Sequence, residues 1–303
     1  MQAMGQIDSH GLGLECSGVV TKVGAAVSNV RVGDRVAAPA EGTFATLVRA
    51  SSWRAMRIPD SMDFESAASL PIVFCTALHA VQMTNLAAGE TVLIHAASGG
   101  LGQALIQLCQ HRGATILATV GTEEKRDFII DHYNIPASCI FSSRDNSFAA
   151  SVMSAAQGRG VDVAFNSLSS ELLRVTWTCL AAFGRFVELG KKDITVNSRL
   201  DMAPFARNVT FSAIDLIAML AERPVQGAKI WSEVMTLLEK GSIRSPFPLT
   251  VCGLAEVDTA IRTMQNGRHI GKLVVVPRAE EKAKASHPAP VEQFPSEVYR
   301  RCI

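Results

Sequence analysis

Short apolar runs alternate with longer amphipathic stretches through the middle of the chain. The apolar runs have the length and composition of buried strands and cover residues 91–96, 115–121, 139–143, 161–167 and 185–190. The stretches that favour helices cover residues 66–87, 103–113, 123–134, 148–157, 171–184 and 229–240. Strands that alternate with helices predict an α/β fold with a doubly wound parallel sheet between about residues 91 and 240.

Both flanks of this region have β character instead. Residues 12–50 form short β-rich runs separated by turn signals, with a strand expected at 43–50 and Gly33-Asp34 typical of a hairpin turn. Two further β-rich runs, 247–251 and 272–277, follow the last helix. We therefore expect a β-rich domain over residues 1–72, a nucleotide-binding domain over 73–243, a returning β segment over 244–277 and a polar tail over 278–303.

Length and composition limit the classes of function. A chain of 303 residues suggests two domains, and 29 basic against 28 acidic residues leave a net charge of +1. That balance argues against nucleic acid or an anionic membrane surface as a partner. We find no run of 18 apolar residues and no secretory signal, and the seven scattered cysteines include no CxxC pair. These features favour a cytoplasmic protein with reduced thiols and no structural zinc.

A glycine-rich segment joins the first predicted strand to its helix. It reads Ala97-Ser98-Gly99-Gly100-Leu101-Gly102, a GxGxxG variant with alanine at the first position. In this context the main-chain N–H groups approach a pyrophosphate at the helix N-terminus, and the last glycine lets helix and strand pack closely. The sequence thus predicts a dinucleotide site, the alternative being a tight turn with no ligand.

Residues after the second predicted strand bear on which dinucleotide binds. An NAD site usually has an acidic residue there, whereas this strand ends at Gly121-Thr122. Lys125 and Arg126 follow, and Arg144 comes after the third strand, so cations are available for a 2′-phosphate. This pattern favours NADPH. NAD remains an alternative, since Glu123 or Glu124 could face the ribose. Lys125 and Arg126 could also belong to a solvated face of the helix without contacting the cofactor.

A segment near the N-terminus bears on metal chemistry. Residues 13–18, GLECSG, resemble the GHExxG segment of zinc alcohol dehydrogenases, but Leu14 stands where the histidine ligand would be. Since leucine cannot bind zinc, alcohol oxidation through a zinc alkoxide is disfavoured. Metal-free hydride transfer to an already electrophilic acceptor, such as a conjugated carbonyl or thioester, stays open.

Many segments together resemble one family, the zinc-free medium-chain dehydrogenases/reductases, and within it the enoylreductase domains of polyketide and fatty-acid synthases. The matching segments include LGLECSGVV, VGDRV, ASLPIVFCTALHAV, GETVLIHAASGGLGQALIQLCQHRGA, GRGVDVAFNSL, CLAAFGRFVELGKKDI and NVTFSAIDL. The resemblance implies a Rossmann domain plus a GroES-like domain. It also implies NADPH-dependent reduction of an α,β-unsaturated acyl thioester on an acyl carrier protein.

The resemblance also carries site residues onto this chain. Lys191, in the GKKD segment, and Asp215 match the lysine and aspartate proposed to assist catalysis in that family, although they could merely cap a loop and a helix. We read His95 as a structural core residue. The implied cofactor contacts are Thr76, Ser98, Gly99, Gly100, Leu101, Gly102, Thr122, Lys125, Arg144, Asn166, Gly190 and Lys272.

The family normally has tens of residues before the segment AMGQI, and those residues include the opening strands of the GroES-like domain. Because this chain begins at Met1 without them, we expect unpaired sheet edges there. Three functions therefore remain open: an enoyl reductase, a zinc-free quinone or enone oxidoreductase, and a catalytically impaired synthase fragment. Other synthase domains and a homodimer through edge strands are the further partners that the resemblance implies.

Overall fold

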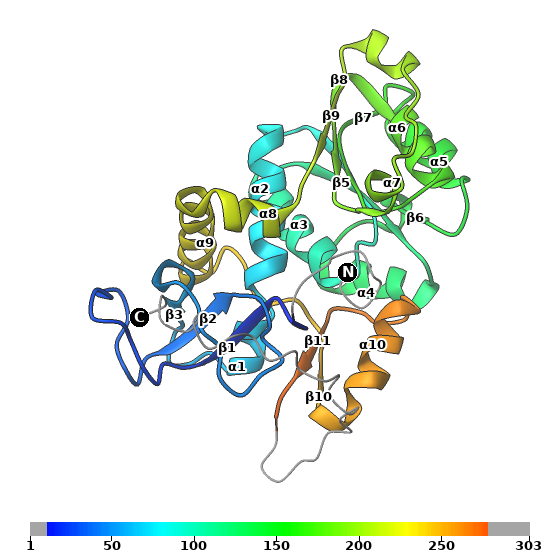
Figure 1. The fold of residues 1–303 in the computed structure, drawn as a ribbon. Helices are drawn as coiled ribbons and strands as arrows, with labels where there is room; N and C mark the ends of the chain where they lie inside the picture. The colour runs from blue at the N-terminus through cyan, green and yellow to red at the C-terminus, as the bar shows by residue number, and fades with distance from the viewer. Residues whose placement is uncertain (1–10, 278–303) are drawn as a thin grey trace.

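A six-stranded parallel sheet forms the centre of the fold in the computed structural model, which describes residues 11–277 (Figure 1). Its strands are β4 (Thr91–Ile94), β5 (Thr115–Val120), β6 (Ile140–Ser142), β7 (Val161–Asn166), β8 (Leu180–Glu188) and β9 (Thr210–Ala213). The spatial order is β6-β5-β4-β7-β8-β9. Renumbered from β4, this is the 3-2-1-4-5-6 order of a Rossmann fold, which confirms the predicted fold class.

Helices cover both faces of this sheet. They are α2 (Pro71–Thr84), α3 (Gly100–His111), α4 (Glu123–Tyr133), α5 (Phe148–Ala155), α6 (Glu171–Thr178), α7 (Lys192–Thr195), α8 (Leu216–Glu222) and α9 (Pro224–Glu239). Alternate residues of β4 point to opposite sides, so Val92 and Ile94 join one buried cluster and Leu93 joins another. The first cluster includes side chains of α2, α3, α4 and α9, and the second includes those of α5 and α6.

The flanking β segments form two small sheets. One is antiparallel, with β1 (Glu15–Val19), β2 (Arg35–Pro39) and β3 (Met56–Arg57), and matches the GroES-like sheet expected from the sequence. The other pairs β10 (Leu249–Cys252) with β11 (Lys272–Val275) in parallel. The remaining elements are α1 (Phe64–Ala68), α10 (Val257–Gln265), η2 (Ser52–Arg54), η3 (Ala137–Cys139), η4 (Ala203–Arg207) and η5 (Leu254–Glu256).

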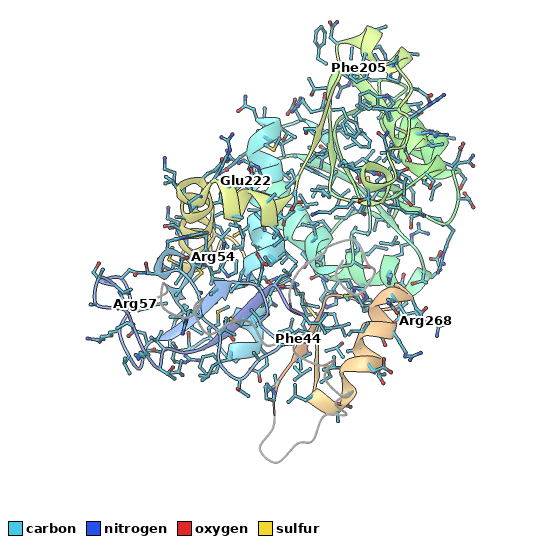
Figure 2. The ribbon with its side chains drawn as sticks, in the orientation of Figure 1. Phe44, Arg54, Arg57, Phe205, Glu222 and Arg268 are labelled. Atoms are coloured by element: carbon cyan, nitrogen blue, oxygen red, sulfur yellow. The ribbon has the colours of Figure 1, made fainter. Side chains whose placement is uncertain are left out.

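Arg54 ties the antiparallel sheet to the helices of the parallel one (Figure 2). Its carbonyl accepts a hydrogen bond from the Trp231 indole nitrogen of α9 at 2.9 Å, and its Nη2 donates to the Leu220 carbonyl of α8 at 3.4 Å. Trp231 is fully buried, so this indole N–H would otherwise be an unsatisfied donor inside the core.

Two helix predictions have wrong boundaries. The helix expected over 171–184 ends at Thr178, and β8 begins at Leu180 because this segment pairs with the start of β7, where Val161 N donates to Cys179 O at 2.9 Å. The helix expected over 66–87 is two helices, α1 and α2, divided before Pro71. Proline has no N–H to donate to the preceding turn, so it begins a new helix.

Two predictions in the N-terminal region also need correction. The strand expected at 43–50 does not form, and Leu47 there is 75% exposed, so the run has no buried face to stabilise it. The hairpin prediction is right only in part, because the run before Gly33 is not a strand. Instead, β2 pairs with β1, and Gly33 N donates to Val20 O at 2.9 Å.

The polar tail predicted for 278–303 lies outside the described residues, as does His10. Within residues 11–277, each helix is too short or too polar to cross a bilayer.

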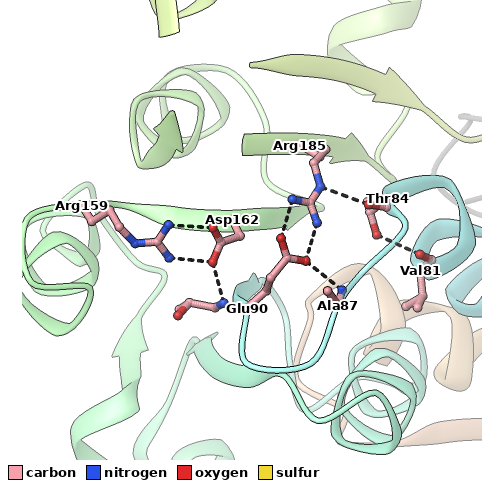
Figure 3. A network of polar contacts seen from close by, with 8 residues as sticks. Val81, Thr84, Ala87, Glu90, Arg159, Asp162 and Arg185 are labelled. Atoms are coloured by element: carbon pink, nitrogen blue, oxygen red, sulfur yellow. Dashed lines mark hydrogen bonds and ion pairs between the residues drawn. The ribbon is translucent and has the colours of Figure 1, made fainter. Parts of the chain in front are cut away.

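A network of charged side chains braces the amino-terminal edge of the parallel sheet (Figure 3). Arg185 of β8 makes a bidentate pair with Glu90 at 2.6 and 2.8 Å, and its Nε donates to the Thr84 carbonyl at 3.1 Å. Glu90 also accepts the Ala87 N–H at 2.9 Å. These bonds join the end of α2 and the loop before β4 to β8, which lies 95 to 101 residues further along the chain.

We expect Glu90→Gln to lower the free energy of unfolding at neutral pH by about 1–3 kcal/mol, because charge-assisted hydrogen bonds are lost. Arg185 lowers the pKa of Glu90 below its ordinary value, against the raising effect of burial. The folded state therefore binds that proton less tightly than the unfolded state. The stabilisation is complete above the unfolded pKa, near 4.3, and is lost as pH falls below it.

Urea unfolding at pH 7 and at pH 3.5 would measure this difference. The gap between wild type and Glu90→Gln should shrink at the lower pH, whereas exposed Glu41→Gln should match wild type at both. Equal unfolding midpoints for wild type and Glu90→Gln at pH 7 would contradict the prediction.

Candidate active site

The predicted site residues gather along one edge of the parallel sheet. They follow or end all six strands: the glycine segment after β4, Thr122 after β5, Arg144 after β6, Asn166 at the end of β7, Lys191 after β8 and Asp215 after β9. Carboxyl ends of parallel strands lie on the same side of the sheet, where ligands of this fold bind. The topology thus brings residues distant in sequence to one edge.

The glycine segment forms the first turn of α3. Gly99 is the N-cap, with extended backbone, and Gln103 N is the first amide that donates back within the helix, to Gly99 O at 2.9 Å. The N–H groups of Gly100, Leu101 and Gly102 therefore have no acceptor within the helix. Such a helix end suits an anion such as a phosphate.

The C-terminal β segment packs directly against this glycine segment. Gly271 N donates to the Ser98 carbonyl at 2.9 Å, and Gly99 and Gly271 form an isolated parallel bridge. Lys272 follows, and its Cδ would lie 3.3 Å from a Cβ placed on Gly100. Its ammonium forms an ion pair with Glu15 of β1. Lys272 thus lies beside the start of α3, but its charge is engaged by Glu15.

Two cations lie beyond the ends of β5 and β6. Arg144 Nε donates to the Gly121 carbonyl at 2.6 Å, and Lys125 Nζ donates to the Gly267 carbonyl at 2.5 Å. Burial and the nearby Arg144 lower the pKa of Lys125, although Glu124 opposes them. Glu123 is 83% exposed and pairs with Arg126 at 3.6 Å. Two cations that repel each other at neighbouring strand ends favour an anionic ligand beside them.

His269 is a residue that the sequence did not single out. Its Nδ1 is buried and has no hydrogen-bond partner in the described part of the chain. Burial lowers its pKa, and Lys125 and Lys272 lower it further, which places His269 near both lysines. The only signal for it in the sequence is a histidine in the closing segment HIGK, three residues before Lys272, one of the implied cofactor contacts.

Lys191 and Asp215 meet across the ends of β8 and β9. The Lys191 ammonium forms an ion pair with Asp215 Oδ2, while Oδ1 accepts the N–H groups of Ile217 and Ala218 at 3.1 and 3.2 Å. Asp215 is therefore both the N-cap of α8 and the partner of Lys191. Burial raises its pKa, but Lys191 and the two amides outweigh burial and hold the pKa below its ordinary value. The Asp215 carboxylate therefore stays charged at neutral pH.

Glu188, the last residue of β8, is a second residue that the sequence did not reveal. Its Oε2 accepts the Asn166 side-chain amide at 2.6 Å, and its Oε1 accepts the Gly190 N–H at 2.8 Å. Burial raises its pKa to about 7, although those two hydrogen bonds lower it and Asp193 raises it. Asn166 and Gly190, both expected at the cofactor, are thus held by Glu188.

The remaining predicted residues have local partners. The Thr76 hydroxyl donates to the Ile72 carbonyl at 2.7 Å within α2, and Thr122 caps α4 by accepting Lys125 N at 3.3 Å. His95 is 3% exposed and lies between the Thr119 and Thr176 hydroxyls at 2.7 and 2.9 Å. Burial lowers its pKa to about 3, so it is a neutral core residue.

The edge holds no evident metal ligands. Among residues 11–277, His, Cys, Asp and Glu side chains nowhere form a group of three that could bind a metal ion. Leu14 precedes β1 at the position where a zinc dehydrogenase would have a histidine.

Comparison with known proteins gives the family. A profile described as an alcohol dehydrogenase GroES-like domain matches residues 3–60, and one described as a zinc-binding dehydrogenase matches residues 136–275. The crystal structure of CurK enoyl reductase is 32% identical, covers 88% of this chain and 79% of its own, and superimposes with a TM-score of 0.80. The chain belongs to the enoyl reductase family. The matching profile is described as zinc-binding, but residues 11–277 of this chain contain no group of side chains that could bind a metal ion.

Curated relatives are much longer polyketide synthases. The enoyl reductase chain is 50% identical over 275 residues to the highly reducing polyketide synthase tstA of Talaromyces stipitatus, which covers 90% of this chain. It is also 50% identical over 282 residues to the reducing polyketide synthase PKS1 of Cochliobolus heterostrophus, which covers 93% of it. In both cases the chain spans 11% of the relative.

Proposed function

We propose that this chain binds NADPH and reduces the double bond of an α,β-unsaturated acyl thioester during polyketide synthesis. One observation carries the proposal: the glycine segment of α3 and the Lys191–Asp215 pair lie on the same edge of the parallel sheet. Family membership supports a reductase, and the polyketide synthase relatives support a thioester on an acyl carrier protein as the substrate. Other synthase domains would then be neighbours of this one.

The residues present fit a phosphorylated dinucleotide. The main-chain amides of Gly100, Leu101 and Gly102, which have no acceptor within the helix, would hold the pyrophosphate at the start of α3. Lys125 and Arg144 would hold the 2′-phosphate, which would relieve the repulsion between these two cations. When bound, the reduced cofactor supplies a hydride to the β-carbon of the substrate.

Lys191 would supply the other half of the addition. Once the β-carbon has gained a hydride, negative charge develops on the thioester oxygen and the α-carbon. The Lys191 ammonium would stabilise that charge and donate one Nζ proton to the α-carbon, which yields the saturated thioester. Asp215 would keep the Lys191 ammonium in place, because its own carboxylate is fixed as the N-cap of α8.

A spectrophotometric assay with crotonyl thioester tests the function. We expect oxidation of NADPH, much slower oxidation of NADH, and a product two mass units heavier than the substrate. Mass analysis is needed because one relative, 33% identical, is named as the ER cyclopropanase of CurF. A quinone offered in parallel separates the reductase from a quinone oxidoreductase. Turnover of the quinone alone, or none of the thioester, would overturn the proposal.

A further inference from the structure

Glu188 connects the ends of three neighbouring strands. Its side chain is bonded to Asn166 at the end of β7 and to the Gly190 N–H after β8. Its own carbonyl accepts the Ile214 N–H at 3.0 Å, one residue before Asp215. A single residue that is 3% exposed therefore reaches the segment that carries Lys191 and the segment that carries Asp215.

The Gly190 contact leaves little freedom in the loop that leads to Lys191. A Cβ built on Gly190 would lie 2.5 Å from Glu188 Oε1, so only glycine allows the main chain to approach the carboxylate this closely. The preceding main-chain N–H, that of Leu189, is also fixed, because it donates to the Asn166 carbonyl at 2.8 Å. Lys191 thus follows two residues whose amides both have defined acceptors.

We infer that Glu188 is a positioning residue that holds Lys191 opposite Asp215. The inference rests on the proposed function, in which Lys191 acts on the substrate. Glu188 itself touches neither Lys191 nor Asp215 through its side chain in the contacts described above. It acts through the Gly190 amide on one side and through the β8–β9 pairing on the other.

A carboxylate is needed because both of its oxygens accept hydrogen bonds. In Glu188→Gln, the amide oxygen could still accept the Gly190 N–H, but the amide nitrogen would then face the Asn166 nitrogen. Asn166 cannot turn over without losing its own bonds, since its nitrogen donates to Leu168 O at 2.8 Å and its oxygen accepts Leu168 N at 3.3 Å. The isosteric variant therefore leaves two buried donors facing each other.

Hydrogen exchange measured by mass spectrometry tests this inference without any catalysis. In Glu188→Gln, amides of residues 189–196 should exchange about 10-fold faster or more, because this segment loses its side-chain anchor and opens locally more often. Amides of residues 213–218, which residue 188 holds through its main-chain carbonyl, should exchange faster only as far as the displaced Lys191 releases Asp215. Glu90→Gln is the matched control, since it removes a carboxylate from the opposite edge of the same sheet. Because it lowers stability as a whole, it should speed exchange in those two segments no more than in the rest of the sheet.

The kinetic counterpart is a selective loss of kcat. Glu188→Gln should lower kcat for the enoyl thioester by a larger factor than it raises the dissociation constant for NADPH, which Asn166 and Gly190 also help to set, and Glu90→Gln should keep both. A purely structural role would instead lower thermal stability and leave kcat per folded molecule unchanged, which would overturn the inference. Unchanged exchange in both segments would overturn it as well.

Two outcomes separate this inference from the proposed function. If wild type reduces no enoyl thioester, the proposed function fails, yet the exchange experiment still decides whether Glu188 orders the two segments. If Glu188→Gln does not fold, the inference is tested on wild type instead, by measuring the hydrogen exchange of the Gly190 amide with NMR. Strong protection of that amide supports the inference, and exchange at the rate of an unfolded peptide overturns it.

Discussion

Lys191→Ala should lower the rate of enoyl thioester reduction by about 10²–10⁴-fold, the range for loss of a positioned proton donor. The ammonium lies at the carboxyl edge of the sheet, paired with Asp215, and its side chain is 17% exposed. Alanine removes both the positive charge beside the developing enolate and the proton for the α-carbon. The effect should appear in kcat rather than in cofactor affinity, because the glycine segment and the Lys125–Arg144 region are untouched.

Lys192→Ala is the matched control, since Lys192 is adjacent in sequence but exposed. It should reduce the thioester at the wild-type rate. The measurements are initial rates at saturating substrate and a fluorescence titration of NADPH for all three proteins. A rate for Lys191→Ala within a few-fold of wild type would remove Lys191 from the proposed chemistry.

Five of the six strands of the parallel sheet, and the helices between them, could be predicted because these strands are apolar runs with turn residues at their ends. The sixth strand, β9, and the helix α8 after it could not, because β9 has four residues and none of them is fully buried. The glycine segment, Lys191 and Asp215 were predictable for a related reason. Each follows a strand of a parallel sheet, and the topology alone brings such positions to one edge. The contact between Lys191 and Asp215 could not be predicted, because it depends on the path of the two loops that follow β8 and β9.

Other features depend on partners distant in sequence. Residues 180–184 have helical composition, yet they form the start of β8 because β7 offers unpaired main-chain groups there. Glu188 reads as one polar residue at the end of an apolar run, and only its contacts with Asn166 and Gly190 reveal a role. His269 belongs to the candidate active site only because the fold brings it near Lys125, which follows β5.

Gly102→Ala should destabilise the fold by about 1–3 kcal/mol, the usual cost of forcing an extra carbon into a packed interior. A Cβ on Gly102 would lie 2.5 Å from the Ala96 carbonyl oxygen and 2.6 Å from Ala97 Cα. Both are main-chain atoms, so no side-chain rotation relieves the contact, and α3 must move away from β4. That movement displaces the amides of Gly100 and Leu101, so NADPH affinity should fall together with the midpoint of urea unfolding.

Gly18→Ala and Gly99→Ala are the controls that separate the loss of stability from the loss of NADPH affinity. A Cβ on Gly18 would meet nothing within 4 Å. Gly18→Ala should therefore have the same midpoint of urea unfolding and the same affinity for NADPH as wild type. A Cβ on Gly99 would lie 3.4 Å from the Ala96 oxygen, an ordinary contact, so this variant should keep its stability. Reduced NADPH affinity in stable Gly99→Ala would then place the dinucleotide against the glycine segment. If Gly102→Ala unfolds at the same urea concentration as Gly18→Ala, the close packing of α3 on β4 does not limit stability.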